Sequence, residues 1–151
     1  VIYGDKAMEL GQLHRSDVIL GADGTLPAAA HPDEWAGQPG TRAPHLWIDR
    51  DQNISTIDLF PNGFTLITEC AAWIEAVDAL RDDLRLPVQP VHVGNAVTVR
   101  DTKTFAEAFG TGADGAALVR PDGIVCWRTT ASPDLEPSGL RDIVQKVAGL
   151  A

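Results

Sequence analysis

Two short apolar runs in the second half of the chain enclose a turn. The runs extend from Ala116 to Val119 and from Ile124 to Trp127, and the tetrapeptide Arg120–Gly123 lies between them. Pro121 presets φ for a turn, and Gly123 supplies the positive φ that closes it. The β-branched and aromatic residues of the runs favour a half-buried, pleated surface. The pattern therefore predicts a β-hairpin.

Apolar residues recur at helical spacing in four further stretches. The two longest patterns predict helices from Ala71 to Leu84 and from Pro137 to Leu150, the second with its proline in the first turn. A short helix is predicted from Thr102 to Phe109, capped by Asp101 or Thr102. A weaker pattern predicts a helix from Tyr3 to Leu13. The inward positions of the two long helices are Trp73, Val77, Leu80, Leu84, Leu140, Ile143, Val144, Val147 and Leu150.

Short apolar or alternating runs predict the remaining strands. They are residues 17–20, 46–48, 54–60, 64–68 and 88–93, and Pro90 in the last run indicates an edge position or a bulge. From Phe64 onward the predicted order is β-α-β-α-β-β-α. This is the connectivity of a thioredoxin-like sheet, so we expect an α/β thioredoxin-like sandwich with an N-terminal extension.

The extension contains a stretch without apolar periodicity. From Thr25 to Pro44 the chain holds four prolines and two glycines, which is typical of an ordered linker or wrapping arm. A structureless stretch of this length is uncommon inside a compact domain, so we place a domain boundary at its end. The compact domain is therefore expected over residues 46–151, preceded by a linker or wrapping arm over residues 21–45.

Composition and charge narrow the classes of partner. The chain of 151 residues has 12 basic and 21 acidic residues, a net charge of −9, and no basic run. Such a surface repels phosphate, so nucleic acid and anionic membranes are unfavourable partners. No apolar run approaches the length of a spanning helix and no signal peptide begins the chain, so we expect a cytoplasmic protein. Because the chain begins at Val1, we expect it to derive from something longer by processing or cloning, with tag removal as the alternative.

The sequence contains one match to a nucleotide-binding fingerprint and two cysteines. Residues 110–115 read G-x-G-x-x-G, but the fingerprint needs a strand before it and a helix after it, and the predicted order is the reverse. Cys70 and Cys126 are too far apart for a C-x-x-C motif, and the position three residues after Cys70 is Trp73. Cys70 precedes a predicted helix, where the helix dipole favours a thiolate. Two hypotheses for Cys70 stay open: a buried structural cysteine, and a lone reactive thiolate. None of the four histidines makes a zinc-spaced pair.

Four segments together carry a resemblance to a known family. They are Gly40–Ile48, Ser55–Phe60, Gly63–Ile67 and Asp114–Arg128, in that order and spacing. They resemble the C-terminal region of the FAD-dependent aromatic hydroxylases, a family that includes phenol and chlorophenol monooxygenases and aromatic polyketide hydroxylases. The motif residues, to which the resemblance gives structural roles only, are Arg42, Pro44, His45, Asp58, Arg120, Asp122, Gly123, Trp127 and Arg128.

The resemblance implies a three-part parent enzyme with an FAD-binding domain, a substrate domain and this C-terminal domain. The parent would use NAD(P)H to reduce FAD and would hydroxylate an aromatic ring. Residues 1–20 would be a tail from the preceding domain, and the C-terminal domain would serve packing or subunit contact and bind no FAD itself. The resemblance therefore predicts no catalytic, cofactor-binding or metal-binding residues in this segment. Two alternatives remain: a stand-alone thioredoxin-like redox protein that uses Cys70, and a non-catalytic interaction module.

Overall fold

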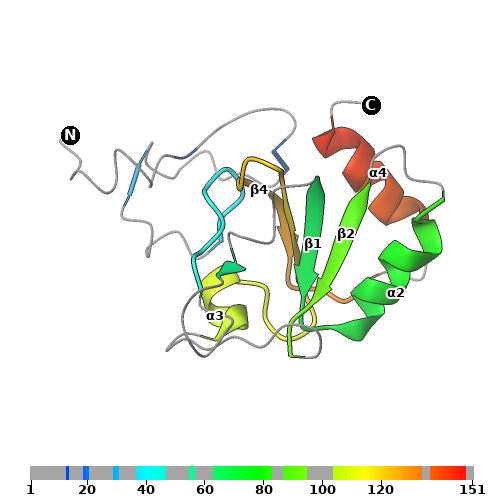
Figure 1. The fold of residues 1–151 in the computed structure, drawn as a ribbon, viewed down its shortest axis with the longest axis horizontal. Helices are drawn as coiled ribbons and strands as arrows, with labels where there is room; N and C mark the ends of the chain where they lie inside the picture. Colours follow the sequence, from blue (N-terminus) through cyan, green and yellow to red (C-terminus); the bar gives the residue numbers. More distant parts are fainter. Residues whose placement is uncertain are drawn as a thin grey trace.

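The fold is a mixed α/β sandwich (Figure 1). The structure, a computed structural model, describes residues 13, 19–20, 29–30, 37–46, 55–56, 63–82, 87–94, 104–133 and 137–148. The strands are β1 (Phe64–Thr68), β2 (Val88–His92), β3 (Ala116–Val119) and β4 (Val125–Thr129). The helices are α2 (Ala71–Leu80), α3 (Phe105–Phe109) and α4 (Pro137–Val147). The predicted order from Phe64 onward, β-α-β-α-β-β-α, is confirmed.

The four strands form one sheet in the order β2-β1-β3-β4. β1 pairs with β2 in parallel, with Leu66 opposite Pro90, and with β3 in antiparallel, with Leu66 opposite Leu118. β3 and β4 pair in antiparallel as the predicted hairpin. β2, which contains Pro90, lies at an edge of the sheet, so the predicted edge position is also confirmed. Proline has no N–H group and is tolerated at an edge, where a backbone donor can remain without a partner strand.

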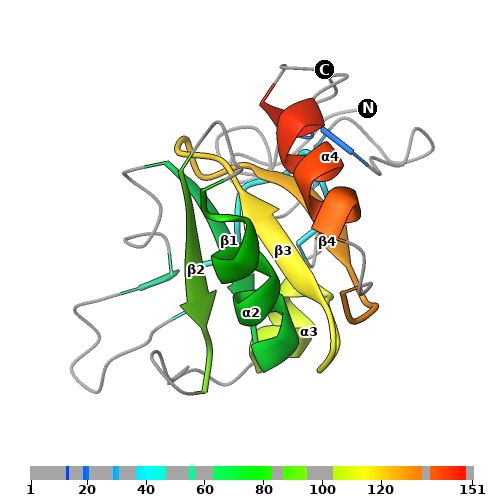
Figure 2. The ribbon, with the colours of Figure 1, turned by 90° about the vertical axis from the view of Figure 1, so that its right-hand side faces the viewer.

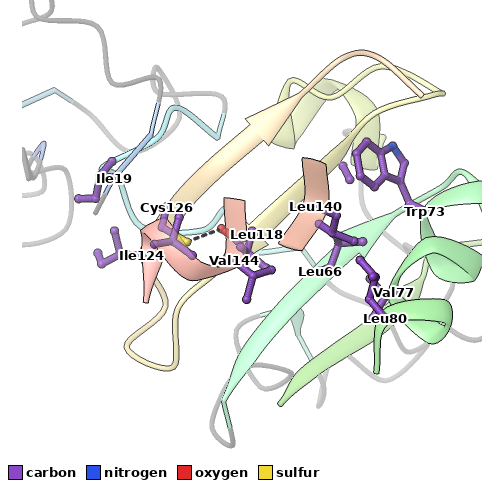
Figure 3. Close-up of a cluster of buried hydrophobic side chains, with 12 residues drawn as sticks. Ile19, Leu66, Trp73, Val77, Leu80, Leu118, Ile124, Cys126, Leu140 and Val144 are labelled. Atoms are coloured by element: carbon purple, nitrogen blue, oxygen red, sulfur yellow. Dashed lines mark hydrogen bonds between the residues drawn. The ribbon is translucent and has the colours of Figure 1, made fainter. Parts of the chain in front are cut away.

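Helices cover both faces of the sheet (Figure 2). α2 and α4 lie side by side on one face, and α3 lies on the other. β3 lies between two strands and is buried along its whole length, so its apolar residues serve both faces. The buried core of the α2/α4 face includes Leu66, Trp73, Val77, Leu80, Leu118, Cys126, Leu140 and Val144 (Figure 3). The core of the α3 face includes Ile67, Val91, Phe105, Phe109, Ala117, Val119 and Val125.

A bulge in β4 changes which side chains reach the α2/α4 face. Leu118 pairs with Trp127 and Val119 pairs with Val125, so that Cys126 is the extra residue of the hairpin. Cys126 and its neighbour Trp127 both contact the α2/α4 core, although regular alternation would place them on opposite faces. The Cys126 thiol donates to the Leu118 carbonyl oxygen at 3.3 Å (Figure 3).

The helices agree with their predicted periodicity, and one predicted cap is wrong. The predicted inward residues Trp73, Val77 and Leu80 of α2 are buried. Leu140, Val144 and Val147 of α4 are buried as well. Leu84 and Leu150 lie outside the described residues. α3 begins later than predicted, because Thr104 and Glu107 form a reciprocal capping box that starts the helix at Phe105. The N-cap of α3 is Thr104, and the predicted caps Asp101 and Thr102 lie outside the described residues.

Most described positions of the strands predicted upstream of residue 63 do not lie in strands. Ile19 and Leu20 lie in a bend and a turn, Leu46 belongs to no strand and Thr56 lies in a 3₁₀ turn, whereas Ser55 forms a β-bridge. The backbone groups here are satisfied by single long-range bonds instead of a ladder: Leu20 N–H donates to the Cys126 carbonyl at 2.8 Å. The remaining residues of these strands, and the helix predicted over residues 3–13 apart from buried Leu13, lie outside the described part.

The described part of the predicted arm packs against the hairpin. Gly40 N–H donates to Val125 O at 2.7 Å, Val125 N–H donates to Thr41 O at 2.9 Å, and Ala43 N–H donates to Gly123 O at 2.7 Å. These bonds pair residues 40–43 with the outer edge of β4, an edge that would otherwise expose unpaired backbone groups. The domain boundary predicted after residue 45 stays a prediction.

Thr56 holds the end of this segment in place through hydrogen bonds of its side chain. Its side chain is fully buried, accepts from Leu46 N–H at 3.0 Å and donates to Pro44 O at 2.6 Å. We expect Thr56→Val to lower the free energy of unfolding by about 1–3 kcal/mol, because a buried N–H group loses its acceptor. Urea unfolding of both proteins measures the difference.

Thr130→Val is the matched control, because Thr130 is exposed and its side chain makes no hydrogen bond to another described residue. Its unfolding free energy should stay within about 0.5 kcal/mol of the parent value. Equal losses in the two variants would contradict the role assigned to Thr56.

Candidate functional site

Four of the motif residues meet at the hairpin turn. Arg120 forms an ion pair with Asp122, and its Nε donates to Asp122 Oδ1 at 3.1 Å. Asp122 also accepts from Ile124 N–H at 3.3 Å, and Gly123 has the positive φ of 84° that the turn requires. Arg42 forms an isolated antiparallel bridge with Ile124 beside this turn. The ion pair is partly exposed and local, so it shapes the turn and contributes little to stability.

Pro44 and His45 lie at the end of the arm. The Pro44 carbonyl accepts the Thr56 hydroxyl, and His45 is exposed. Asp58 lies outside the described residues. Pro44 and His45 therefore lie at the junction between the arm and the domain.

Arg128 links β4 to the end of α3. Its guanidinium donates to the Phe109 carbonyl oxygen at 3.2 Å, where a cation complements the helix dipole. Burial lowers the pKa of Arg128, which remains charged at neutral pH. Gly37 packs against the same carbonyl so closely that a Cβ atom would overlap it. Arg128 and Gly37 therefore serve the contact between the arm, α3 and the hairpin.

The turn between β1 and α2 holds Cys70 in a place unsuited to two-thiol chemistry. Cys70 is half-buried at the N-cap of α2 and is not in a disulfide. A C-x-x-C motif would place its second thiol at Trp73, which is instead a buried indole. The indole N–H donates to the carbonyl oxygens of Asp114 at 3.0 Å and Ala131 at 3.2 Å. Trp73 therefore ties α2 to the segments on either side of the hairpin.

Cys126 is expected to be unreactive in the folded state. Its thiol is fully buried, and burial raises its pKa to about 12. Because the thiolate is the reactive form, this side chain behaves as a small apolar residue.

A groove that sequence reasoning missed opens between α2 and α4. Its volume is about 380 Å³, within the range of small-molecule ligand sites. Trp73 and Trp127 meet in it edge to face, with ring centroids 5.5 Å apart and planes at 70°. We call it the tryptophan groove; its lining is Ala72, Trp73, Glu75, Ala76, Ala79, Leu80, Trp127, Thr129, Ala131, Ser132, Pro133, Gly139, Leu140 and Ile143. The only sequence signal was the run of small residues at helical spacing on α2.

Gly139 belongs to the groove without being required by the backbone. It lies in the first turn of α4, it is exposed, and a Cβ atom added there would meet nothing within 4 Å. Glycine weakens a helix relative to alanine. Because Gly139 has no side chain, the wall of the groove that α4 forms is low at this position.

We compared the described residues with three further features: a metal site, a membrane-spanning helix and a dinucleotide-binding loop. Within the described ranges, no three histidine, cysteine, aspartate or glutamate side chains gather as metal ligands could. The described helices include none long and apolar enough to cross a membrane. At residues 110–115 a helix precedes and a strand follows, as predicted, and Gly110 is the left-handed C-cap of α3.

Together these observations define a thioredoxin-like α/β domain whose second thiol position is filled by tryptophan. The chain belongs to the family described as the C-terminal domain of aromatic-ring hydroxylases, whose family model matches residues 36–151. The family predicted from the four motif segments is therefore confirmed.

Curated relatives and solved structures agree with this assignment. The chain is 36% identical over 141 residues to aklavinone 12-hydroxylase RdmE of Streptomyces purpurascens, covering 91% of the chain and 26% of that protein. It is 35% identical over 152 residues to 4-methyl-5-nitrocatechol 5-monooxygenase of a Burkholderia species, covering 95% and 28%. The crystal structure of aklavinone-11 hydroxylase with FAD and aklavinone matches 95% of the chain with a TM-score of 0.85 and 35% identity, over 27% of its own length. The chain thus spans about a quarter of the length of these relatives.

The two cysteines should differ sharply in reactivity. At about pH 8 we expect iodoacetamide to modify half-buried Cys70 and to leave Cys126 unmodified, because a thiol with its pKa raised this far forms almost no thiolate. Peptide mass spectrometry of the native protein measures both sites, and the unfolded protein, in which both should react, is the control. Equal labelling of both thiols in the native protein would show that the Cys126 site opens.

Replacing Gly139 should stabilise the domain. Gly139→Ala is expected to raise the free energy of unfolding by up to about 0.5–1 kcal/mol, because alanine has the better helix propensity and the added Cβ meets open space. Urea unfolding measures this change. Gly37→Ala is the opposing control, expected to destabilise because Gly37 combines a φ of 72° with contact to the Phe109 carbonyl. A loss of stability in Gly139→Ala would mean that the backbone needs glycine there.

Proposed function

We propose that this chain is the C-terminal accessory domain of an FAD- and NAD(P)H-dependent aromatic-ring monooxygenase. In this proposal its own contribution is packing and subunit contact, and the flavin and substrate sites lie in the other domains of the parent enzyme. The observation that carries the proposal is the match to about a quarter of aklavinone-11 hydroxylase, whose crystal structure holds FAD and aklavinone. Relatives named as monooxygenases for phenol and 2,4-dichlorophenol support an aromatic substrate class.

The glycine-rich residues 110–115 do not fit the pyrophosphate of FAD. A dinucleotide pyrophosphate needs backbone N–H groups at the beginning of a helix. The glycines of residues 110–115 instead follow the end of α3, where the helix dipole is negative. Gly115 is packed against the carbonyl oxygens of Thr111 and Thr129, whose partial charges repel a phosphate. The glycine pattern here serves close backbone packing, and no step of the hydroxylation is assigned to this chain.

The described residues also favour a structural contribution over a catalytic one. Arg120 and Asp122 are used in a turn, Arg128 is used at the end of α3, and Trp73 joins α2 to the loops beside the hairpin. Each of these side chains thus orders backbone segments. A domain built in this way supplies a rigid surface to its neighbours, which is the role that the proposal assigns to it.

The proposal predicts where flavin resides. The purified 151-residue chain should show no flavin absorbance after incubation with FAD and gel filtration, whereas the parent polypeptide that contains it should retain FAD and oxidise NAD(P)H with an aromatic substrate. Absorbance spectroscopy measures both. Stoichiometric FAD on the 151-residue chain would refute the accessory role, and a parent polypeptide without FAD would refute the flavoenzyme itself.

A further inference from the structure

The tryptophan groove leaves apolar side chains open to solvent on the α2/α4 face. Trp127 and Ile143 are only half-buried, and Ala72 and Ala79 are exposed. These residues come from β4, α4 and α2, so the apolar surface is continuous across three elements. A contiguous apolar surface of this kind, within a hollow, marks a contact with another polypeptide segment or a ligand.

The walls of the groove carry small side chains, which leave space for another polypeptide segment. On α2 the lining positions carry alanine at residues 72, 76 and 79, one helical face. On α4 the facing position is Gly139, although alanine would satisfy the helix better. Small side chains let another backbone approach closely. The groove therefore suits a polypeptide segment that inserts apolar side chains toward Trp127.

One charged side chain lies in this apolar lining. Glu75 is exposed, and the structure records neither an ion pair nor a hydrogen bond for it in the described part of the chain. By contrast, Asp78 on the same helix is paired with Arg81 at 2.8 Å. A carboxylate beside an indole favours a cation with an aliphatic stem, because the cation can meet both the carboxylate and the ring face. The complementary segment is apolar and carries a lysine or arginine.

We propose that the tryptophan groove binds an apolar, lysine- or arginine-bearing segment of the FAD- and substrate-binding part of the same polypeptide. This inference rests on the proposed function, because it needs a parent enzyme in which that part is present. It adds to the proposed function by naming the surface that performs the packing and the chemistry of what it binds.

Two observations favour a segment of the same polypeptide over a second copy or a free partner. Ile19 and Leu20, in the N-terminal extension, pack into the same core that forms the floor of the groove, and Leu20 bonds to Cys126, next to Trp127. The chain that precedes the domain therefore reaches it on the α2/α4 face. The 14 residues that line the groove are also fewer than the roughly 20–30 residues that each partner contributes to a standard stable interface. A tethered segment needs less, since its effective concentration is on the order of millimolar.

Carbodiimide footprinting of the unmodified protein tests the proposal directly. The labelling rates of Glu75 and Asp82 are measured by mass spectrometry in the 151-residue chain and in the parent polypeptide. Asp82 is the internal reference, because it follows the same helix, is exposed, lies outside the groove lining, and has no recorded ion pair or hydrogen bond in the described part. We expect Glu75 to be labelled about tenfold more slowly in the parent polypeptide at every protein concentration, with Asp82 changed less than about twofold.

The other results each overturn the proposal in a different way. Equal labelling of Glu75 in both proteins, with FAD retained by the parent polypeptide, would exclude the groove as the contact and leave the proposed function intact. Protection of Glu75 that rises with protein concentration would identify a second copy as the occupant. A parent polypeptide that retains no FAD would remove the proposed function on which the inference rests.

Matched variants in the parent polypeptide provide a second test. Gly139→Leu and Ala72→Arg fill the groove, so Glu75 should regain the labelling rate of the 151-residue chain. Asp142→Leu and Ala71→Arg change exposed neighbours outside the groove lining and should leave Glu75 protected. Circular dichroism of the 151-residue variants confirms that each one folds. Protection that survives both groove-filling changes in folded proteins would contradict the proposal.

Discussion

The antiparallel pairing of β1 with β3 is the constraint on which the rest of the structure depends. Thr68, at the end of β1, is fully buried and donates its hydroxyl hydrogen to Gly115 O at 2.6 Å. The same hydroxyl oxygen accepts from Cys70 N–H at 3.0 Å, and the Thr68 carbonyl accepts from Val93 N–H at 2.8 Å. One residue thus joins the start of β3, the turn into α2 and the end of β2. A Cβ atom on Gly115 would overlap the carbonyl oxygens of Thr129 and Thr111, so no larger residue fits immediately before β3.

This central pairing explains why both faces of the sheet are covered. β3 is buried on both sides, so each face needs its own layer, and α2 with α4 supplies one layer while α3 and the arm supply the other. Arg128 and Trp127 show the consequence at adjacent positions of β4. Arg128 holds the end of α3 on one face, and Trp127 meets Trp73 on the opposite face. The hairpin therefore connects the two layers as well as completing the sheet.

Sequence reasoning succeeded where the determinants are local. The alternation of runs around Pro121 and Gly123 predicted the hairpin, and the spacing of Trp73, Val77 and Leu80 predicted the buried face of α2. It failed where backbone groups find partners far along the chain. Leu20 bonds to Cys126 and Leu46 bonds to the Thr56 hydroxyl, and neither contact leaves a periodic pattern in the sequence.

In the candidate site, too, the local features could be predicted from the sequence and those that depend on residues far along the chain could not. Arg120 and Asp122 are two positions apart in a turn, so their pairing was open to prediction from sequence. The tryptophan groove depends on the β4 bulge, which brings Trp127 to the face of Trp73. A continuous apolar run from Ile124 to Trp127 carries no alternation from which that bulge could be inferred. The bulge therefore places a residue of one strand in the lining of a groove between two helices.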